Sequence, residues 1–254
     1  MAEQAAPAST AAIARSHAGV TAASAIGLLD ANRAWPAFHL EDQLRRDLAA
    51  GGDVPLYTAA RDILPPALDE HGRKWRLDAV RYAGVDLPTS ELGRSIGHWN
   101  PGDQIEAFHV ISGSVQMVLC EPGDGPALRV RCDEGSIVIL SPGWWHSTFV
   151  DRGPALVVNV YNAEGGPGDS TKYTRRRPRE LSVLRAPHGT AVVRAGRPAH
   201  VLERVAPPAT RFGIDSLEGV MAPGNAAALT HLAELANAPL DERFECAPAP
   251  LPTR

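Results

Sequence analysis

The middle of the chain alternates between short apolar segments and turns rich in Gly, Pro and Asp. Short segments of this kind, separated by such turns, are typical of strands in an antiparallel sandwich or barrel. The segments with the clearest pattern are 108–110, 114–120, 127–132, 136–140 and 155–161. The pattern therefore predicts an all-β core in this part of the chain.

The regions on either side of this core have a different pattern. Residues 1–26 are rich in Ala, Ser and Thr, so we expect them to bury little surface. Residues 41–50 and residues 225–237 each suit one short helix, and residues 181–194 suit a hairpin. We predict an N-terminal extension over 1–52, a barrel domain over 53–200, and a C-terminal extension with a helix and a Pro-rich tail over 201–254.

Composition narrows the class of protein. Among 254 residues, 23 are Gly and 22 are Pro, which disfavours a helical bundle. A net charge of −4 gives no reason to expect binding to nucleic acid or to an anionic membrane. The 3 cysteines have no paired spacing, so they support neither a disulfide framework nor a zinc–thiolate site. No long apolar run and no secretory signal is present, and we expect a cytoplasmic protein.

Two turn-bounded segments, 97–113 and 135–146, carry most of the candidate chemistry. Residues two apart on a strand face the same side, so His98 and Asn100 can point into one cavity. Glu106 follows a Pro-Gly-Asp turn, and His146 follows a Pro-Gly turn. Imidazole and carboxylate groups together suit a divalent metal of intermediate hardness.

These two segments resemble the two motifs of the cupin family, small jelly-roll barrels with a metal at the centre. The first motif has the form G-x5-H-x-H-x3,4-E-x6-G, and His98, Glu106 and Gly113 match it. The second, G-x5-P-x-G-x2-H-x3-N, is matched at Gly135, Gly143 and His146. The resemblance implies an all-β cupin jelly-roll barrel, which the flanking patterns would extend with short helices at both ends.

Within the cupins, the chain is most similar to the archaeal-type glucose-6-phosphate isomerases over roughly residues 53–200. The similar segments are Pro55-Leu-Tyr57, Arg61-Asp62, Arg76-Leu-Asp78, 94–98, 142–146 and 159–165. The resemblance implies one divalent transition metal (Fe, Mn, Ni, Co or Zn) held by His98, Asn100, Glu106 and His146. It also implies substrate contacts from Arg94, Ser95, Gly97 and Tyr161.

The chain departs from the family pattern at several positions. Asn100 stands where the family has a second metal-binding histidine, and a carboxamide binds transition metals more weakly than imidazole. Val80 and Phe108 replace an expected threonine and an expected aromatic hydroxyl, while Ser141 and Val150 replace a Pro and an Asn of the second motif. His109 is three residues from Glu106 and would need a β-bulge to face the metal. Whether Asn100 or His109 completes the metal shell is open at this point.

Three functions are compatible with these residues. The first is a metal-dependent isomerase that interconverts the aldose and ketose forms of a sugar phosphate or related hydroxy-carbonyl compound, with Glu106 as the catalytic proton carrier. The second is a cupin oxygenase, lyase or epimerase in a biosynthetic pathway, since the fold alone does not determine the reaction. The third is a cupin that binds a small molecule without catalysis. In each case we expect a small-molecule ligand, no nucleic-acid or membrane partner, and a homodimer.

Overall fold

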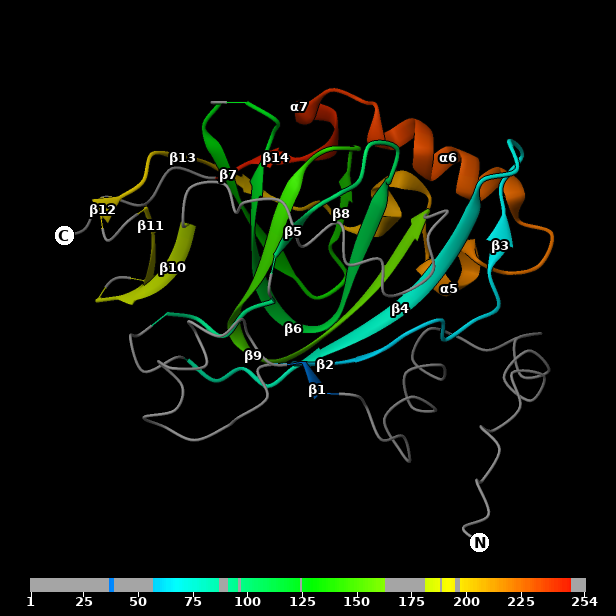
Figure 1. The fold of residues 1–254 in the computed structure, drawn as a ribbon. Helices are drawn as coiled ribbons and strands as arrows, with labels where there is room; N and C mark the ends of the chain where they lie inside the picture. Colours follow the sequence, from blue (N-terminus) through cyan, green and yellow to red (C-terminus); the bar gives the residue numbers. More distant parts are fainter. Residues whose placement is uncertain are drawn as a thin grey trace, which may run out of the picture.

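The computed structural model describes residues 37–38, 57–86, 91–95, 97–123, 125–162, 181–187, 189–194 and 197–247. Their main feature is a barrel formed by one 11-stranded sheet (Figure 1). Its longer strands are β4 (Lys74–Tyr82), β6 (Glu106–Cys120), β7 (Ala127–Asp133), β8 (Ile137–Leu140), β9 (Trp145–Asn162) and β13 (Val201–Val205). Its shorter strands are β1 (Ala37–Phe38), β2 (Tyr57–Ala60), β3 (Ala67–Leu68), β5 (His98–Trp99) and β14 (Glu245–Cys246).

Antiparallel pairing dominates this sheet. Neighbouring strands follow the order β1-β2-β4-β9-β6-β7-β13-β14, with β3 beside β4, β5 beside β9, and β8 beside β6. Strand β9 pairs with β6 over most of its length and with β4 over residues 155–162. Among the described strands, β13 is the exception, because it runs parallel to β7. It reaches β7 after a long connection rather than a hairpin, and parallel pairing requires a connection of that kind.

Strand β6 bends where the first motif ends. Its register with β9 shifts between Val110 and Val115, and Gly113 adopts a φ of 79° there. A Cβ at this position would lie 2.6 Å from the carbonyl oxygen of Pro154, so only glycine fits without displacement. The bend lets the first part of β6 pair with β8 and the second part pair with β7.

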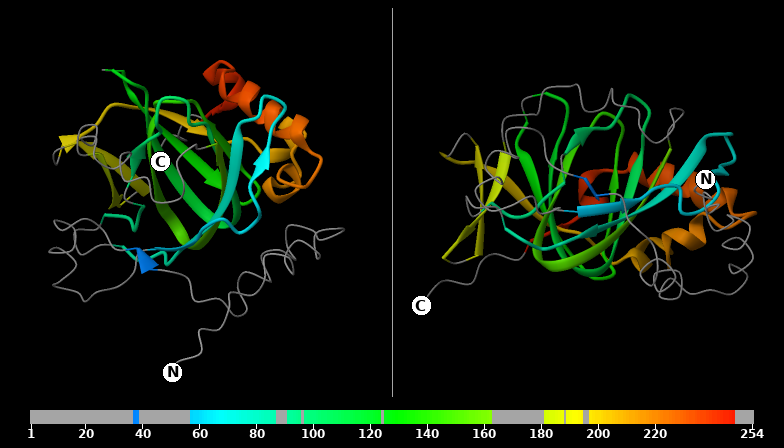
Figure 2. Two further views of the ribbon diagram at one scale, coloured as in Figure 1. Left: turned by 45° about the vertical axis from the view of Figure 1, so that its right-hand side comes forward. Right: turned by 60° about the horizontal axis from the view of Figure 1, so that its bottom comes forward.

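The helices lie together on one side of the barrel, and a second sheet lies on the opposite side (Figures 1 and 2). The helical elements are η1 (Ala209–Phe212), α5 (Leu217–Val220), α6 (Ala226–Ala236) and α7 (Leu240–Arg243). The second sheet consists of β10 (Leu181–Ala186), β11 (Gly189–Arg194) and β12 (Arg197–Pro198). The helix predicted over 225–237 and the hairpin predicted over 181–194 are therefore confirmed. The helix expected over 41–50 lies outside the described residues.

Two apolar cores hold the barrel and the C-terminal residues together. Outside the barrel wall, Trp75, Leu77 and Val158 pack with Leu217 of α5 and Leu232 of α6. Inside the barrel, the buried side chains of one cluster are Met117, Leu119, Val138, Leu140 and, from near the end of the chain, Phe244. Residues 201–247, which lie in the predicted C-terminal extension over 201–254, thus contribute two strands to the sheet and side chains to both cores.

The fold is all-β, a barrel of antiparallel strands with short C-terminal helices, as the alternating pattern and the two motifs predicted. Within the described part of the chain, no helix is long and apolar enough to cross a membrane.

Candidate metal centre

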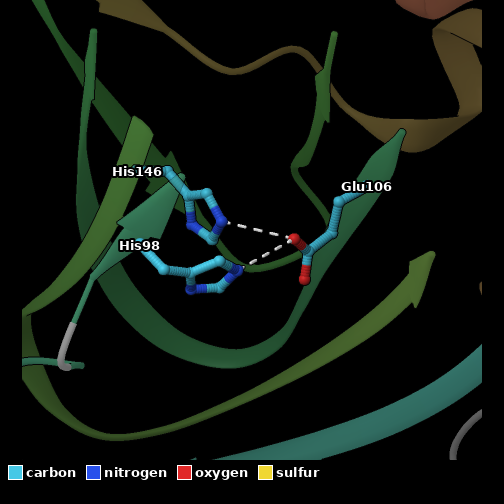
Figure 3. Close-up of side chains that lie close together, drawn as sticks. All are labelled: His98, Glu106 and His146. Carbon is cyan, nitrogen blue, oxygen red and sulfur yellow. Dashed lines mark ion pairs between the residues drawn. The ribbon is translucent and has the colours of Figure 1, made fainter. Parts of the chain in front are cut away.

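Three side chains meet inside the barrel (Figure 3). The Nε2 atom of His146 lies 3.2 Å from Oε2 of Glu106, and the Nε2 atom of His98 lies 3.8 Å from the same oxygen. The two imidazole rings are 4.3 Å apart at an angle of 68°. The potential ligand atoms of all three residues fall within 4.8 Å of one another. The structure thus brings together three of the four residues predicted to bind a metal.

Strand pairing positions these side chains. His98 on β5 is the direct register partner of His146 on β9. Glu106 is the first residue of β6 and pairs with Leu140 of β8 and Tyr161 of β9. The second motif therefore supplies His146 at the start of β9, while the first motif supplies the other two residues from β5 and β6.

Two amide side chains hold the carboxylate of Glu106. Asn159 donates a hydrogen bond from Nδ2 to Oε1 over 2.8 Å, and Gln104 donates from Nε2 to Oε2 over 3.2 Å. Both amides are buried. The sequence analysis missed both residues. Gln104 follows Asn100 after three intervening residues, the spacing at which the first motif allows its acid, and this spacing could have indicated it.

Asn100, the fourth predicted ligand, is connected to Glu106 through Gln104. The Nε2 atom of Gln104 also donates to Oδ1 of Asn100 over 3.3 Å. The Asn100 side chain is completely buried, and its backbone N–H donates to the carbonyl of Trp144. Asn100 therefore belongs to the hydrogen-bond network behind the cluster and links it to the loop that precedes His146.

His109 lies on the opposite face of β6. It pairs with Ile137 and Val158, whose side chains belong to the outer core. It is buried, and burial lowers the pKa of its imidazole. The strand shows no bulge between Glu106 and His109, because their register with β8 is continuous. This placement favours Asn100 over His109 as the fourth member of the site.

A small cavity opens onto the cluster. It has a volume of about 50 Å³ and contains His98, Glu106 and His146 in its wall. The other polar side chains of the wall are Tyr57, Arg61, Tyr82, Ser95, Thr148, Asn159 and Tyr161. Because one water needs about 10–15 Å³ by this measure, the cavity has room for a few waters or a small ligand.

The predicted substrate residues divide into two groups. Ser95, Gly97 and Tyr161 line the cavity, whereas the guanidinium of Arg94 does not. Arg94 donates instead from Nε to Glu91 over 2.8 Å and lies over the ring of Phe149, outside the barrel interior. The arginine in the cavity wall is Arg61, to which we had assigned no role.

Arg61 is held by a buried carboxylate. Its Nη1 donates to Oδ2 of Asp78, and Oδ1 of Asp78 accepts from the backbone N–H of Asp62. A second ion pair joins Arg76 to Asp62 over 2.8 Å, so that the segment with Arg61 and Asp62 and the segment with Arg76 and Asp78 are linked twice. Burial raises the pKa of Asp78, and the Arg61 guanidinium opposes that rise.

Two tyrosine hydroxyls complete the polar wall. Burial raises the pKa of Tyr82 to about 12, against hydrogen bonds with Thr148 and Ser95 that lower it. Burial and the nearby charge of Asp78 likewise raise the pKa of Tyr161. Both phenols are therefore protonated at neutral pH. The Tyr161 hydroxyl bonds to the Asp78 carboxylate, whereas the Tyr82 hydroxyl can donate to a ligand oxygen.

The loop before His146 is fixed by the C-terminal residues. The Ser141 hydroxyl donates to the carbonyl of Ala236 at the end of α6 over 2.7 Å, and it accepts from Nη1 of Arg243 over 3.0 Å. Arg243 also donates to the carbonyl of Ile139, and its guanidinium lies 5.4 Å from the ring of Trp144. Ser141, which replaces the first proline of the second motif, therefore anchors this loop.

The cluster fits a divalent metal by its donor chemistry. Two imidazole nitrogens and a carboxylate oxygen converge on one point, and such sets bind Fe, Mn, Co, Ni and Zn. Neither ring nitrogen of His146 makes a hydrogen bond of good geometry within the described residues, although the ring is buried. Orphaned buried nitrogens are uncommon, and a metal ligand bond would satisfy one of them.

No protein-family model matches this chain. No curated protein matches it either. Among solved structures, Bacillus subtilis oxalate decarboxylase matches with a TM-score of 0.34 and 16% identity, over 45% of this chain and 26% of that one. An oxalate oxidase in complex with the substrate analogue glycolate matches with a TM-score of 0.33 and 15% identity, over 44% and 53%. Peruvianin-I, a cysteine peptidase from Thevetia peruviana latex, matches with a TM-score of 0.37 and 13% identity, over 53% and 70%.

The match thus spans about a quarter of the oxalate decarboxylase chain. Partial overlaps of this kind carry no information on activity, and the functional argument below depends on the site itself.

Proposed function

We propose that this chain is a metal-dependent cupin enzyme that moves a proton between neighbouring carbons of a small hydroxy-carbonyl compound, interconverting its aldose and ketose forms. His98, Glu106 and His146 would hold one divalent ion, with Asn100 or water completing the shell. The observation that carries the proposal is the convergence of these three side chains within 4.8 Å in the wall of the barrel cavity. The small cavity favours a compact substrate over a hexose phosphate.

When bound, such an ion supplies Lewis-acid stabilisation of the negative charge that develops on a substrate oxygen. The chain's own groups supply the proton transfer. The Glu106 carboxylate, or a water beside it, takes a proton from one carbon and returns it to the next. Asn159 and Gln104 hold this carboxylate in one orientation. The protonated Tyr82 can donate to a substrate oxygen, since it lines the same cavity.

Metal content tests the site directly. We would reconstitute the wild type, His146→Ala and His109→Gln with Fe²⁺, Mn²⁺, Co²⁺, Ni²⁺ and Zn²⁺ in turn and measure bound metal. We expect about one equivalent in the wild type and in His109→Gln, and little in His146→Ala. The His109 variant is the matched control because it removes a histidine from the outer face of the same barrel. Equal metal content in all three proteins would contradict the proposed site.

Proton transfer is tested separately by deuterium exchange. With the metal-loaded wild type in D2O, NMR should detect deuterium on the carbon next to the carbonyl of glyceraldehyde or dihydroxyacetone, together with interconversion of the two. His146→Ala should show neither reaction. Substrate turnover without exchange from solvent would favour a shielded transfer, while an absence of both in the metal-loaded wild type would exclude these substrates.

One observation favours a second candidate, an oxygenase. Two histidines and one carboxylate are the ligand set of many non-haem Fe(II) oxygenases, and the cluster supplies that set. Oxygen consumption that requires Fe²⁺ and a small organic substrate, with no activity from Zn²⁺ or Mn²⁺, would support this candidate over isomerisation.

A further inference from the structure

A groove with a volume of about 560 Å³ lies at the second sheet, and its wall shares no residue with the cavity at the metal centre. The wall residues come from the turn before β7, from β11 and β12, and from the segment between β12 and β13 (Figure 1). They are Gly125, Pro126, Arg194, Arg197, Pro198, Ala199 and His200. Within the described part of the chain, this wall thus contains two arginines and a histidine but no carboxylate.

Strand pairing places the two arginines opposite each other. Arg194 of β11 is the direct register partner of Arg197 of β12. Direct partners on antiparallel strands share one face of the sheet, with Cβ atoms about 4.5–5.5 Å apart, and like charges at such positions repel. Arg194 also follows Val192 by two residues, and Val192 packs in the apolar core that joins this sheet to the barrel. The two arginines therefore lie on the face of the sheet that is turned toward the barrel.

Neither arginine has a counter-charge. Among the residues that the structure describes, no ion pair and no side-chain hydrogen bond involves Arg194 or Arg197. Arg194 is half-buried, and its Nε atom is buried without a hydrogen bond of good geometry. By contrast, Arg129, Arg131 and Arg185 each form an ion pair with a carboxylate. Two opposed cations without a partner destabilise the hairpin that carries them, and a bound anion would remove that cost.

We infer that this groove is a second ligand site, which takes a phosphate group, free or on a small molecule, between Arg194 and Arg197. A guanidinium presents a planar set of N–H donors that matches the oxygens of a phosphate, and a dianion balances two positive charges. The imidazole of His200, in the same wall, can donate a further hydrogen bond. The site uses none of the residues of the proposed function, so either can be correct without the other.

The test measures binding of inorganic phosphate and of glycerol 3-phosphate by calorimetry at pH 7 and low salt. We expect both to bind the wild type, and Arg194→Gln and Arg197→Gln each to weaken binding about 3- to 10-fold. The double variant should bind neither probe measurably. Tighter binding of glycerol 3-phosphate than of phosphate would assign the site to organic phosphates, because the groove has room beyond the phosphate group.

Arg131→Gln is the matched control. It removes one exposed arginine charge from β7, outside the groove, and should leave both affinities unchanged. His146→Ala is the second control, since phosphate could also bind a metal ion at the barrel centre. It should bind phosphate as the wild type does.

Thermal stability gives an independent readout. Without phosphate and at low salt, Arg197→Gln should raise the thermal midpoint, because it removes the repulsion between the two guanidinium groups. Phosphate should then raise the midpoint of the wild type more than that of the variant. Arg131→Gln, which loses an ion pair with Asp133, should show neither effect.

Four results would overturn the inference. They are no phosphate binding by the wild type, an equal loss of affinity in Arg131→Gln, a loss in His146→Ala but not in the folded Arg194 and Arg197 variants, and a lower midpoint for ligand-free Arg197→Gln. The third would place the phosphate at the metal centre. The fourth would show that Arg197 is already stabilised by a partner within the protein.

Discussion

The two faces of the barrel wall differ sharply in chemistry at the end that holds the site. On the outer face, Trp75, Leu77 and Val158 pack against helices α5 and α6. On the inner face, the neighbouring positions of the same two strands are Asp78 and Asn159, which are direct register partners. Alternation along β4 and β9 therefore places apolar side chains outward and polar side chains inward, the reverse of a sheet with one solvated face.

The two faces of the barrel wall therefore have different roles. The outer face supplies stability through burial under the helices, since each apolar side chain there is removed from water. The inner face keeps polar groups buried by bonding them to one another, as Asn159 and Gln104 do with Glu106. Substitutions on the two faces should therefore affect different measured quantities.

Glu106→Gln should have the largest effect on the inner face. It removes the charge from the cluster and should lower metal affinity by more than about 100-fold, the upper end for outer-shell changes. The amide has the same shape but can accept from only one of the two side chains, Asn159 and Gln104, that donate to the carboxylate, so the thermal midpoint of the metal-free protein should fall modestly. Chelator competition measures the affinity, and a variant that binds metal like the wild type would remove Glu106 from the site.

Leu232→Ala should have the largest effect on the outer face. Leu232 of α6 is completely buried against the barrel, and truncation of such residues costs about 2–5 kcal/mol of unfolding free energy. Urea denaturation would measure the loss, with the exposed Glu234→Ala on the same helix as control. Metal affinity of the folded variant should stay at the wild-type value, and a large drop would show that the two faces are coupled.

Asn159→Ala should weaken metal binding by about 10- to 100-fold, as is usual when a group that orients a ligand is removed. Its donor to Glu106 is lost while the three candidate ligands remain. Gln116→Ala is the control, a buried amide on β6 that bonds to Thr190 instead. Equal losses of metal affinity in the two variants would mean that general destabilisation, not carboxylate orientation, is responsible.

The smallest expected effect on unfolding free energy is that of a substitution at Glu218, a carboxylate on α5. Its two carboxylate oxygens are buried with no hydrogen bond of good geometry among the described residues, and burial raises its pKa above 4.5. Because the unfolded state ionises first, the contribution of Glu218 to stability is full at acid pH and is lost as the pH rises toward its folded pKa. Glu218→Gln should therefore increase the unfolding free energy at pH 7 and leave it unchanged at pH 4. Parallel pH profiles of unfolding free energy for variant and wild type would contradict this.

Sequence reasoning predicted the features that depend on local pattern. Strand alternation and the two motifs indicated the barrel and the meeting of His98, Glu106 and His146, and the local pattern over 225–237 indicated the helix α6. The inward direction of Glu106 and the outward direction of His109 also followed from strand periodicity. The helix expected over 41–50, the natural substrate and the homodimer remain predictions.

The features that were missed depend on register between distant strands. Asn159 reaches Glu106 because β9 pairs with β6 in one register, and no local pattern specifies that register. Arg61 follows β2 and is held in the cavity wall by its contact with Asp78 of β4. Phe244 lies in a short segment without periodicity, so its place inside the barrel could not be read from its neighbours.

The anchoring of the loop before His146 has a consequence for how the protein is made. Arg243 bonds to residues 104 and 102 positions earlier in the chain, Ile139 and Ser141. The chain is synthesised from its N-terminus, so the strands that carry the candidate ligands emerge from the ribosome well before Arg243, which fixes their loop. The site is therefore completed only after residue 243 has been synthesised, and a nascent chain that stops short of residue 243 should hold metal less tightly than a chain that includes it.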